Sequence, residues 1–128
     1  MGLSAPDAAW ESACTEHFRR RVESDPQFVA LVVDGPEAGL ISSGCGWLEH
    51  WLPGLSNPSG RVGYIASMST DEAARGRGLA RAIFEGLLAW FDEQRVGSIH
   101  LHASKYGEPL YRSYGFAEPP NIELTLRR

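Results

Sequence analysis

The chain has 128 residues and a formal net charge of -4; 43% of its residues are hydrophobic and 22% are charged. That length suits one domain, residues 1–128, with a core of its own, and the composition is ordinary for a globular protein. The acidic balance argues against general nucleic-acid binding, which needs a basic face, and no apolar run approaches the roughly 20 residues of a membrane-spanning helix.

The first half of the chain predicts a helix followed by two strands. Apolar residues recur at helical spacing over residues 7–24, and Asp25-Pro26 ends that helix. Residues 28–33 and 40–48 are apolar runs of strand length, separated by a turn rich in glycine. A loop rich in tryptophan and proline follows over residues 49–60.

The two cysteines, Cys14 and Cys45, have neither metal-ligand nor redox-motif spacing. We therefore expect buried thiols, no metal site and a reducing, cytoplasmic compartment. The first residues also lack the basic-then-apolar pattern of a secretory signal peptide, which favours the same compartment.

A turn with two glycines and two arginines, residues 75–80, lies between a predicted strand and a predicted helix. The strand covers residues 62–70, and the helix has apolar residues at helical spacing from Ala80 to Phe91. A helix N-terminus offers unpaired N–H groups and a partial positive charge, which suit a phosphate. The turn therefore predicts a bound anion, and a phosphorylated cofactor is the candidate that we expect.

The last part of the chain predicts a strand, a short helix and a final strand. Residues 98–103 alternate between apolar and polar side chains, residues 109–114 have proline in a first helical turn, and residues 122–126 have a strand pattern. The whole order is α-β-β-β-α-β-α-β. It predicts an α/β (α+β) fold with a mixed, mostly antiparallel sheet flanked by helices.

Two motifs resemble those of the GNAT acyltransferase superfamily, whose members move an acyl group from coenzyme A to an amine. Arg75, Gly78 and Ala80 match the cofactor motif Arg/Gln-x-x-Gly-x-Gly/Ala. Leu110-Tyr111 and Gly115-Phe116 match the second motif, Leu-Tyr-x-x-x-Gly-Phe, and the resemblance covers about the last hundred residues. It implies acetyl-CoA as cofactor and transfer of acetyl to a primary amine of a small molecule or peptide.

The resemblance also assigns roles to residues. Tyr111 occupies the motif position of the family's general acid, which protonates the departing thiolate. Pantetheine is expected beside the strand end and the diphosphate on the turn and helix start. The expected cofactor-binding residues are Met68, Ser69, Thr70, Arg75, Gly76, Arg77, Gly78, Leu79, Ala80, Arg81 and Ser104.

Two departures from the family pattern stand out. The usual first strand has no counterpart before residues 7–24, so either the sheet is trimmed or a partner covers an exposed strand edge; that edge predicts a homodimer. Ser104 stands where many members have asparagine.

The general base has no obvious residue, and Glu49, His50, His102 or a water all remain candidates. Trp47, Trp51 and Pro53 are expected to wall the entrance for the acceptor, or merely to cover the sheet.

Three other functions can be compared with the sequence. Dinucleotide binding fails because Arg81 stands at the place of the third glycine, and a P-loop fails because Gly-Lys-Ser/Thr is absent. A non-catalytic protein of the same fold that senses acyl-CoA, or acts as a partner subunit, stays open.

Overall fold

The computed structural model describes residues 16, 19–35 and 40–128. Residues 19–24 are helical, as predicted, while the rest of the expected helix over 7–24, Cys14 included, falls mostly outside the described residues. The elements that follow are β1 (Phe28–Asp34), β2 (Leu40–His50), β3 (Arg61–Thr70), the short 3-10 turn η1 (Glu72–Ala74), α2 (Leu79–Gln94), β4 (Ser98–Leu101) and α3 (Glu108–Ser113).

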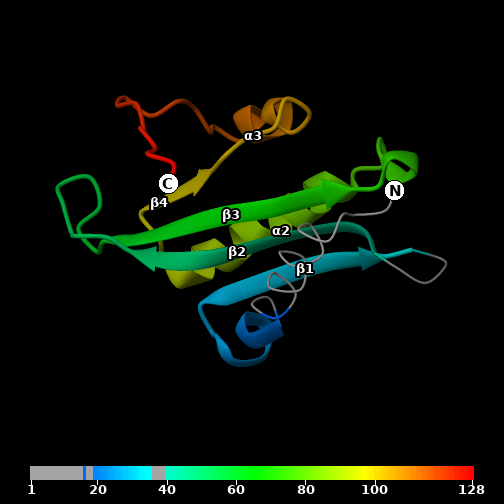
Figure 1. Cartoon of the computed structure of the whole chain (residues 1–128), viewed down its shortest axis with the longest axis horizontal. Coiled ribbons are helices and arrows are strands. Elements are labelled where there is room, and N and C mark those ends of the chain that lie inside the picture. The colour runs from blue at the N-terminus through cyan, green and yellow to red at the C-terminus, as the bar shows by residue number, and fades with distance from the viewer. Residues whose placement is uncertain (1–15, 17–18, 36–39) are drawn as a thin grey trace.

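The four strands form one mixed sheet in the order β1-β2-β3-β4 (Figure 1). β1 with β2 and β2 with β3 pair antiparallel, whereas β3 and β4 pair parallel. A parallel pair needs a crossover connection, and α2 supplies it. The mixed, mostly antiparallel sheet flanked by helices is therefore confirmed.

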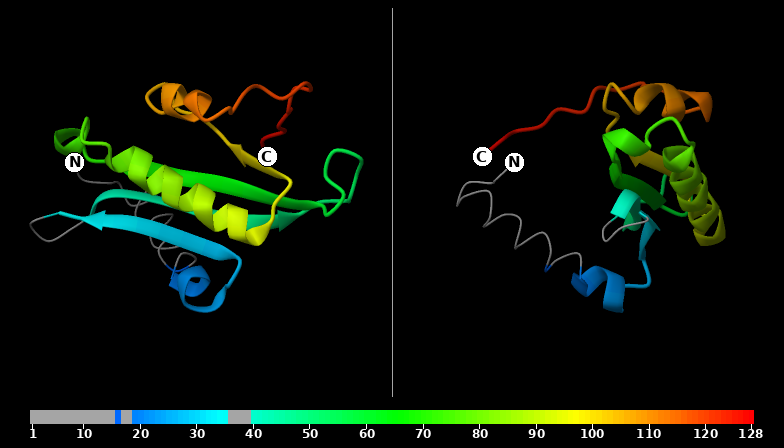
Figure 2. Two further views of the ribbon diagram at one scale, coloured as in Figure 1. Left: turned by 180° about the vertical axis from the view of Figure 1, so that it is seen from behind. Right: turned by 90° about the vertical axis from the view of Figure 1, so that its right-hand side faces the viewer.

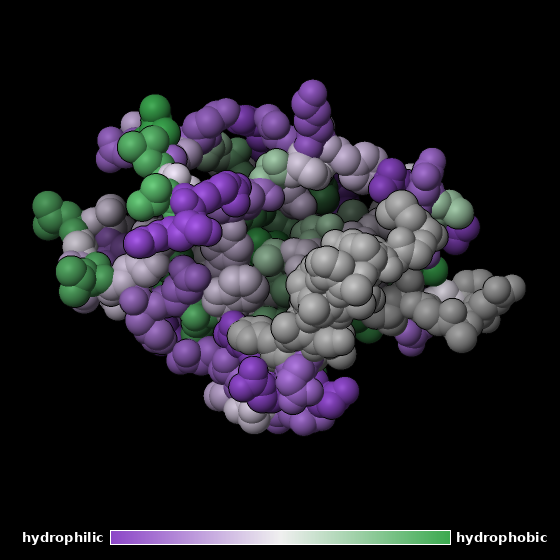
Figure 3. Space-filling model, viewed as in Figure 1, coloured by the Kyte–Doolittle hydropathy of each residue, from purple (hydrophilic) through white to green (hydrophobic). Residues whose placement is uncertain are grey.

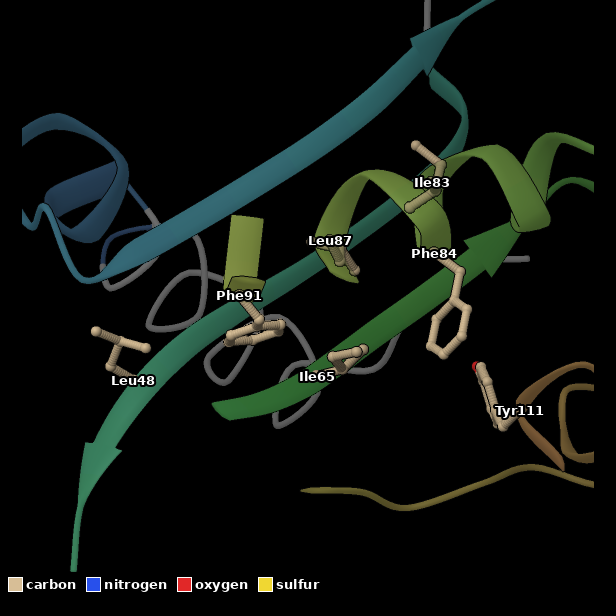
Figure 4. Close-up of a cluster of buried hydrophobic side chains, with 7 residues drawn as sticks. All are labelled: Leu48, Ile65, Ile83, Phe84, Leu87, Phe91 and Tyr111. Atoms are coloured by element: carbon tan, nitrogen blue, oxygen red, sulfur yellow. The ribbon is translucent and has the colours of Figure 1, made fainter. Parts of the chain in front are cut away.

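The core lies between one face of this sheet and α2 (Figure 2). The buried side chains come from β2, β3, α2 and α3 and converge in Figure 4: Leu48, Ile65, Ile83, Phe84, Leu87, Phe91 and Tyr111. The face of α2 that the sequence pattern marked as apolar is the face that is buried here.

Glycines in the sheet let α2 approach its backbone. A Cβ added at Gly63 would lie 2.5 Å from Phe91 Cε1, and one at Gly46 would lie 2.8 Å from Phe91 Cζ. Real Cβ atoms do not tolerate such contacts. Gly46 in β2 and Gly63 in β3 thus have a packing reason, because the Phe91 ring occupies the space that their side chains would need.

A β-bulge interrupts β3 close to its end. Ser43 pairs with Ser69 and Cys45 with Ala66, so Ser67 and Met68 together oppose Gly44. Ser67 has φ of 57°, a left-handed conformation that is uncommon outside glycine. A bulge bends the strand that contains it, so the last residues of β3 turn away from the line of β4.

Two sequence predictions for the end of the chain need correction. Strand β4 ends at Leu101 and not at residue 103, although Ile99 and Leu101 do pack on the core as the alternation predicted. The final strand expected over 122–126 is not formed: these residues have no strand partner, and Ile122, Leu124 and Leu126 are exposed. Period-two alternation specifies a strand only where a sheet edge is there to pair with it.

Candidate active site

Strands β3 and β4 part in the middle of the sheet and leave one edge of β3 open. Their parallel pairing runs only from Val62 with Ser98 to Ile65 with Leu101. Beyond that point β3 continues to Thr70 and pairs with β2 alone among the described strands. Backbone N–H and C=O groups of an unpaired strand edge can bond an extended ligand.

The loop after β3 brings a helix N-terminus to the same place. Gly76 has φ of 84° and Gly78, the N-cap of α2, has φ of 77°. Neither position has an atom within 4 Å of an added Cβ, so glycine is needed for backbone conformation and leaves open space above the loop. The first backbone hydrogen bond of α2 runs from the Ala82 N–H to the Gly78 carbonyl, so the N–H groups just before it lack partners within the helix.

One cavity of about 210 Å³ joins the open edge of β3, this loop and α3. Most of the residues predicted to hold the cofactor line it, together with Tyr111, whereas Arg77 and Leu79 do not. The lining residues are Met68, Ser69, Thr70, Arg75, Gly76, Gly78, Ala80, Arg81, Ser104, Tyr106, Gly107, Leu110 and Tyr111.

Two tyrosines hold the arginines at the mouth of the cavity. The Arg75 guanidinium lies 4.5 Å from the centre of the Tyr106 ring, and its Nε donates to the Thr70 carbonyl at 3.3 Å. Arg81 Nη1 donates to the Tyr114 hydroxyl at 2.9 Å. Sequence reasoning missed Tyr106, because no spacing rule links it to an arginine 31 positions earlier; only the folded loop does.

Tyr111 stands at the inner end of the cavity and belongs to the core as well. Its side chain is buried, and its ring packs 5.1 Å from that of Phe84 (Figure 4). A Cβ on Gly107 would lie 2.9 Å from its hydroxyl, so this glycine makes room for the phenol. Burial raises the pKa of Tyr111 above its ordinary value of 10, which keeps the hydroxyl protonated at neutral pH.

Ser104 connects β4 to α3 at the rim of the cavity. Its hydroxyl oxygen accepts a hydrogen bond from the Gly107 N–H at 3.1 Å, and its carbonyl accepts one from Glu108 N–H at 2.9 Å. The side chain therefore stabilises the turn that begins α3, and its own hydroxyl proton is still available to a ligand.

The three candidate bases differ in their surroundings. Glu49 accepts hydrogen bonds from two indole N–H groups, those of Trp47 at 3.1 Å and Trp51 at 3.3 Å. His50 is exposed at the last position of β2.

His102 is the candidate next to the fork between β3 and β4. It directly follows Leu101; its Nδ1 bonds the Tyr64 hydroxyl and its Nε2 lies 3.2 Å from Glu123 Oε2. Burial first, and then the charges of Glu123 and Glu49, raise the pKa of Tyr64. The phenol therefore stays protonated and can donate its proton to Nδ1.

The tryptophans near the loop lie on the sheet and do not line the cavity. Trp47 stacks between Phe28 and Tyr64, with ring centres 6.1 Å and 5.2 Å away, and Trp51 packs 4.9 Å from the His100 ring. Pro53 is exposed in the loop. Their expected role as a wall for the acceptor stays a prediction.

Metal chemistry has no obvious site in the part of the chain that the structure describes. No group of three or more His, Cys, Asp or Glu side chains there is arranged to hold a metal ion. The helices of the same residues include none that is long and apolar enough to cross a bilayer.

An open strand edge, a helix N-terminus and a protonated tyrosine line one cavity. Such a site suits an extended anionic cofactor and a reaction in which a group must gain a proton. A family model described as an acetyltransferase (GNAT) domain matches residues 4–122. The chain belongs to the GNAT acetyltransferase family, whose acyl donor is acetyl-CoA.

Solved structures of acetyltransferases have the same fold. A predicted acetyltransferase from Clostridium acetobutylicum, solved with acetyl-CoA, is 28% identical over 89% of this chain and 73% of its own, with a TM-score of 0.78. A GCN5-related N-acetyltransferase from Ralstonia eutropha is 24% identical over 98% and 82%, with a TM-score of 0.80. Glucosamine-6-phosphate N-acetyltransferase from Arabidopsis thaliana is 17% identical over 88% and 75%, with a TM-score of 0.71. No curated protein matches the chain.

Proposed function

We propose that this protein transfers the acetyl group of acetyl-CoA to a primary amine of a small molecule or peptide. The observation that supports the proposal is the cavity itself, which is lined by the open edge of β3, the arginine-glycine loop and Tyr111. The whole chain acts as one catalytic domain in this proposal.

The cofactor would lie along three parts of the cavity. The diphosphate would bind the N–H groups at the start of α2 with Arg75 and Arg81, where helix dipole and formal charge both favour an anion. The pantetheine arm would pair with the open edge of β3 at Met68, Ser69 and Thr70. Ser104 would donate its hydroxyl proton to the same arm or to a water. Of the predicted residues, Arg77 and Leu79 have the weakest support, since neither lines the cavity.

The reaction would proceed by direct attack of the neutral amine on the thioester carbonyl carbon. The C–N bond forms, and backbone N–H groups of β3 stabilise the oxyanion of the tetrahedral intermediate. The C–S bond then breaks, and the Tyr111 hydroxyl gives its proton to the thiolate sulfur. The raised pKa of Tyr111 suits this task, because a protonated phenol is needed at the moment of C–S cleavage.

We favour His102 among the candidate bases. The imidazole follows β4 at the fork, two residues before Ser104, so it adjoins the wall of the cavity. Because Nδ1 bonds the Tyr64 hydroxyl and Nε2 faces Glu123, the ammonium proton would pass to the Tyr64 oxygen while that phenol gives its own proton to Nδ1, and the Glu123 carboxylate would stabilise the imidazolium. Glu49, His50 and a water remain alternatives, with Glu49 already occupied by two indole N–H donors.

Release of thiol from acetyl-CoA tests the proposal. Turnover with any amine in a panel of small amines and peptides supports the enzyme, whereas binding of coenzyme A with no turnover favours the non-catalytic acyl-CoA sensor. The Tyr111→Phe variant should lower kcat by roughly 10²- to 10⁴-fold and leave cofactor affinity nearly unchanged. Tyr114→Phe is the matched control: Tyr114 does not line the cavity, and loss of the hydroxyl that accepts from Arg81 should weaken cofactor binding but keep kcat at saturating acetyl-CoA. An unchanged kcat in Tyr111→Phe would reject Tyr111 as the acid.

Two properties of the whole protein stay predictions. A cytoplasmic location depends on the sequence and not on the geometry of the site. A homodimer is also expected from the sequence, because of its exposed strand edge.

A further inference from the structure

Two arginines that line the cavity each contact a tyrosine from the segment around α3. The Arg75 guanidinium lies 4.5 Å from the centre of the Tyr106 ring, and Arg81 donates from Nη1 to the Tyr114 hydroxyl at 2.9 Å. The Arg81 guanidinium also lies 5.4 Å from the centre of the Tyr114 ring. Arg77, the third arginine near the loop, does not line the cavity and contacts no tyrosine among the described residues. Both tyrosine contacts thus fall on arginines that face the cavity.

These contacts leave most N–H donors of the two arginines available to an anion. A guanidinium is planar, so an aromatic ring contacts its face while the N–H groups point outward in its plane. Within the described residues only Nε of Arg75 has a hydrogen-bond partner, the Thr70 carbonyl, and only Nη1 of Arg81 has one. No carboxylate of those residues forms an ion pair with either arginine. Figure 3 shows mostly hydrophilic side chains on the surface over α3 and the loop after β3, which suits a charged ligand.

The turn before α3 determines the position of Tyr106 without help from its side chain. The Ser104 hydroxyl accepts from the Gly107 N–H at 3.1 Å, and the Ser104 carbonyl accepts from the Glu108 N–H at 2.9 Å. Tyr106 lies between these bonded residues; it is 60% exposed, and its hydroxyl has no hydrogen-bond partner among the described residues. A side chain this exposed adds little to the core, so stability alone does not explain why its ring lies on Arg75.

Tyr114 is held in a different way, by packing on the core. Its ring meets the fully buried Phe84 ring edge-on, with the ring centres 5.2 Å apart. Its hydroxyl therefore has a defined place beside the first turn of α2, where Arg81 is located. The two tyrosines thus contact their arginines differently: Tyr106 through the face of its ring, and Tyr114 mainly through its hydroxyl.

We propose, on the basis of the function proposed above, that Tyr106 and Tyr114 are positioning residues that hold two arginines ready for the diphosphate of the acyl donor. The arginines are Arg75 and Arg81. An arginine side chain loses rotational freedom when it binds a phosphate, and one that is already held in place loses less. The segment around α3 then acts on both ends of the donor. Tyr111 serves the thioester end, and the tyrosines on either side of it set the affinity for the diphosphate end.

Calorimetric binding of coenzyme A tests the proposal through the different contact of each tyrosine. Tyr106→Leu removes the aromatic face and should raise the Kd about two- to fivefold, the factor expected for a cation–π contact at an exposed site. Tyr106→Phe keeps that face and should keep the Kd. Tyr114→Phe removes the hydroxyl that accepts from Arg81 and should raise the Kd about two- to tenfold. The same change, tyrosine to phenylalanine, is therefore expected to be neutral at position 106 and to weaken binding at position 114.

Double variants show whether each tyrosine acts through its arginine. In the Arg75→Gln background Tyr106→Leu should no longer change the Kd of coenzyme A, because the side chain that it positions is gone. The same is expected of Tyr114→Phe in the Arg81→Gln background. An equal loss of affinity with and without the arginine would overturn the proposal, and would indicate that the tyrosine contacts the cofactor directly.

An acyl donor without the diphosphate separates positioning from damage to the fold. S-acetylpantetheine has the thioester arm of acetyl-CoA but no diphosphate. With acetyl-CoA, Tyr106→Leu and Tyr114→Phe should raise KM and leave kcat unchanged, whereas with S-acetylpantetheine neither constant should change. Equal losses with both donors would show that the substitutions only disturb the fold, and would overturn the proposal. If the wild-type protein bound no coenzyme A, the proposed function would fail as well; if it bound coenzyme A equally well in all the tyrosine variants, this inference alone would fail.

Discussion

The contact between Gly63 and Phe91 determines how closely α2 packs on the sheet. The Phe91 ring is fully buried, and it contacts both Gly63 of β3 and Gly46 of β2. An alanine Cβ at position 63 would lie 2.5 Å from Cε1 and 2.6 Å from Cδ1 of this ring. Ordinary contact begins at 3.4 Å, so the ring or the helix must move by about 0.9 Å, the difference between 3.4 and 2.5.

Two opposing effects decide the size of the change in Gly63→Ala. Overpacking a core costs about 1–3 kcal/mol. Replacing glycine by alanine lowers the conformational entropy of the unfolded chain, which stabilises the folded state by about 0.4–1 kcal/mol. The φ angle at position 63 is not positive, so alanine meets no backbone strain there. The net of these two effects is a fall of about 0–2.6 kcal/mol in the free energy of unfolding, and we expect the upper half of that range because the ring has little room to move. The Phe91 ring cannot relax easily, because Trp90 packs edge-on against it at 5.1 Å.

Urea unfolding measures this difference, with an unchanged m-value as a sign that the transition stays two-state. In the Phe91→Leu background the smaller side chain leaves room, so Gly63→Ala should cost at least about 1 kcal/mol less there, a coupling typical of residues in contact. Gly54→Ala, in an exposed loop with no atom within 4 Å of the new Cβ, is the matched control. A neutral Gly63→Ala, or equal costs in the two backgrounds, would refute the steric reasoning.

Gly78→Ala meets no steric clash but places alanine at φ of 77°, so the free energy of unfolding should fall by about 1–2 kcal/mol. Calorimetry should also show weaker binding of coenzyme A. Unchanged stability and affinity would show that the left-handed N-cap is dispensable. In His102→Gln the amide side chain can still hydrogen-bond Tyr64 and Glu123 but cannot take up a proton. The kcat should therefore fall about 10²-fold while cofactor affinity is retained. An unchanged kcat would favour a water or another residue as the base. Burial raises the pKa of Tyr111, so its protonated form is lost only as the pH rises through a value above 10. A plot of kcat against pH should therefore show no descending limb from this group below that value. A limb below about pH 9 that disappears in Tyr111→Phe would contradict the assignment.

The parts of the site that depend on neighbouring residues could be predicted from the sequence. The strand, the glycine turn and the helix N-terminus are consecutive in the chain, and φ at Gly76 and Gly78 is a property of the turn itself. The apolar spacing along α2 also predicts its buried face without knowledge of the sheet. These determinants are local, so the residue pattern is sufficient to find them.

Contacts between distant segments could not be predicted in this way. Tyr106 stacks on Arg75 only because the chain after β4 returns over the loop after β3. The bulge at Ser67 depends on the register against Gly44, which no residue in β3 reveals. Conversely, residues 122–126 alternate as a strand would, yet no strand pairs with them in the described part of the chain.

The cavity is a consequence of how β3 and β4 separate, and several non-local features act together to separate them. The bulge turns β3 after Ala66, whereas β4 loses its partner after Leu101 and the chain bends at Ser104 into the turn of α3. Tyr111 then fills the inner end of the fork from α3, and Gly107 leaves room for its hydroxyl. If β3 lacked its extra residue, the alternation of its last side chains would be inverted and its edge could continue along β4. The proposed acid and the open strand edge would then no longer face the same space, so the function depends on the bulge as much as on the two motifs.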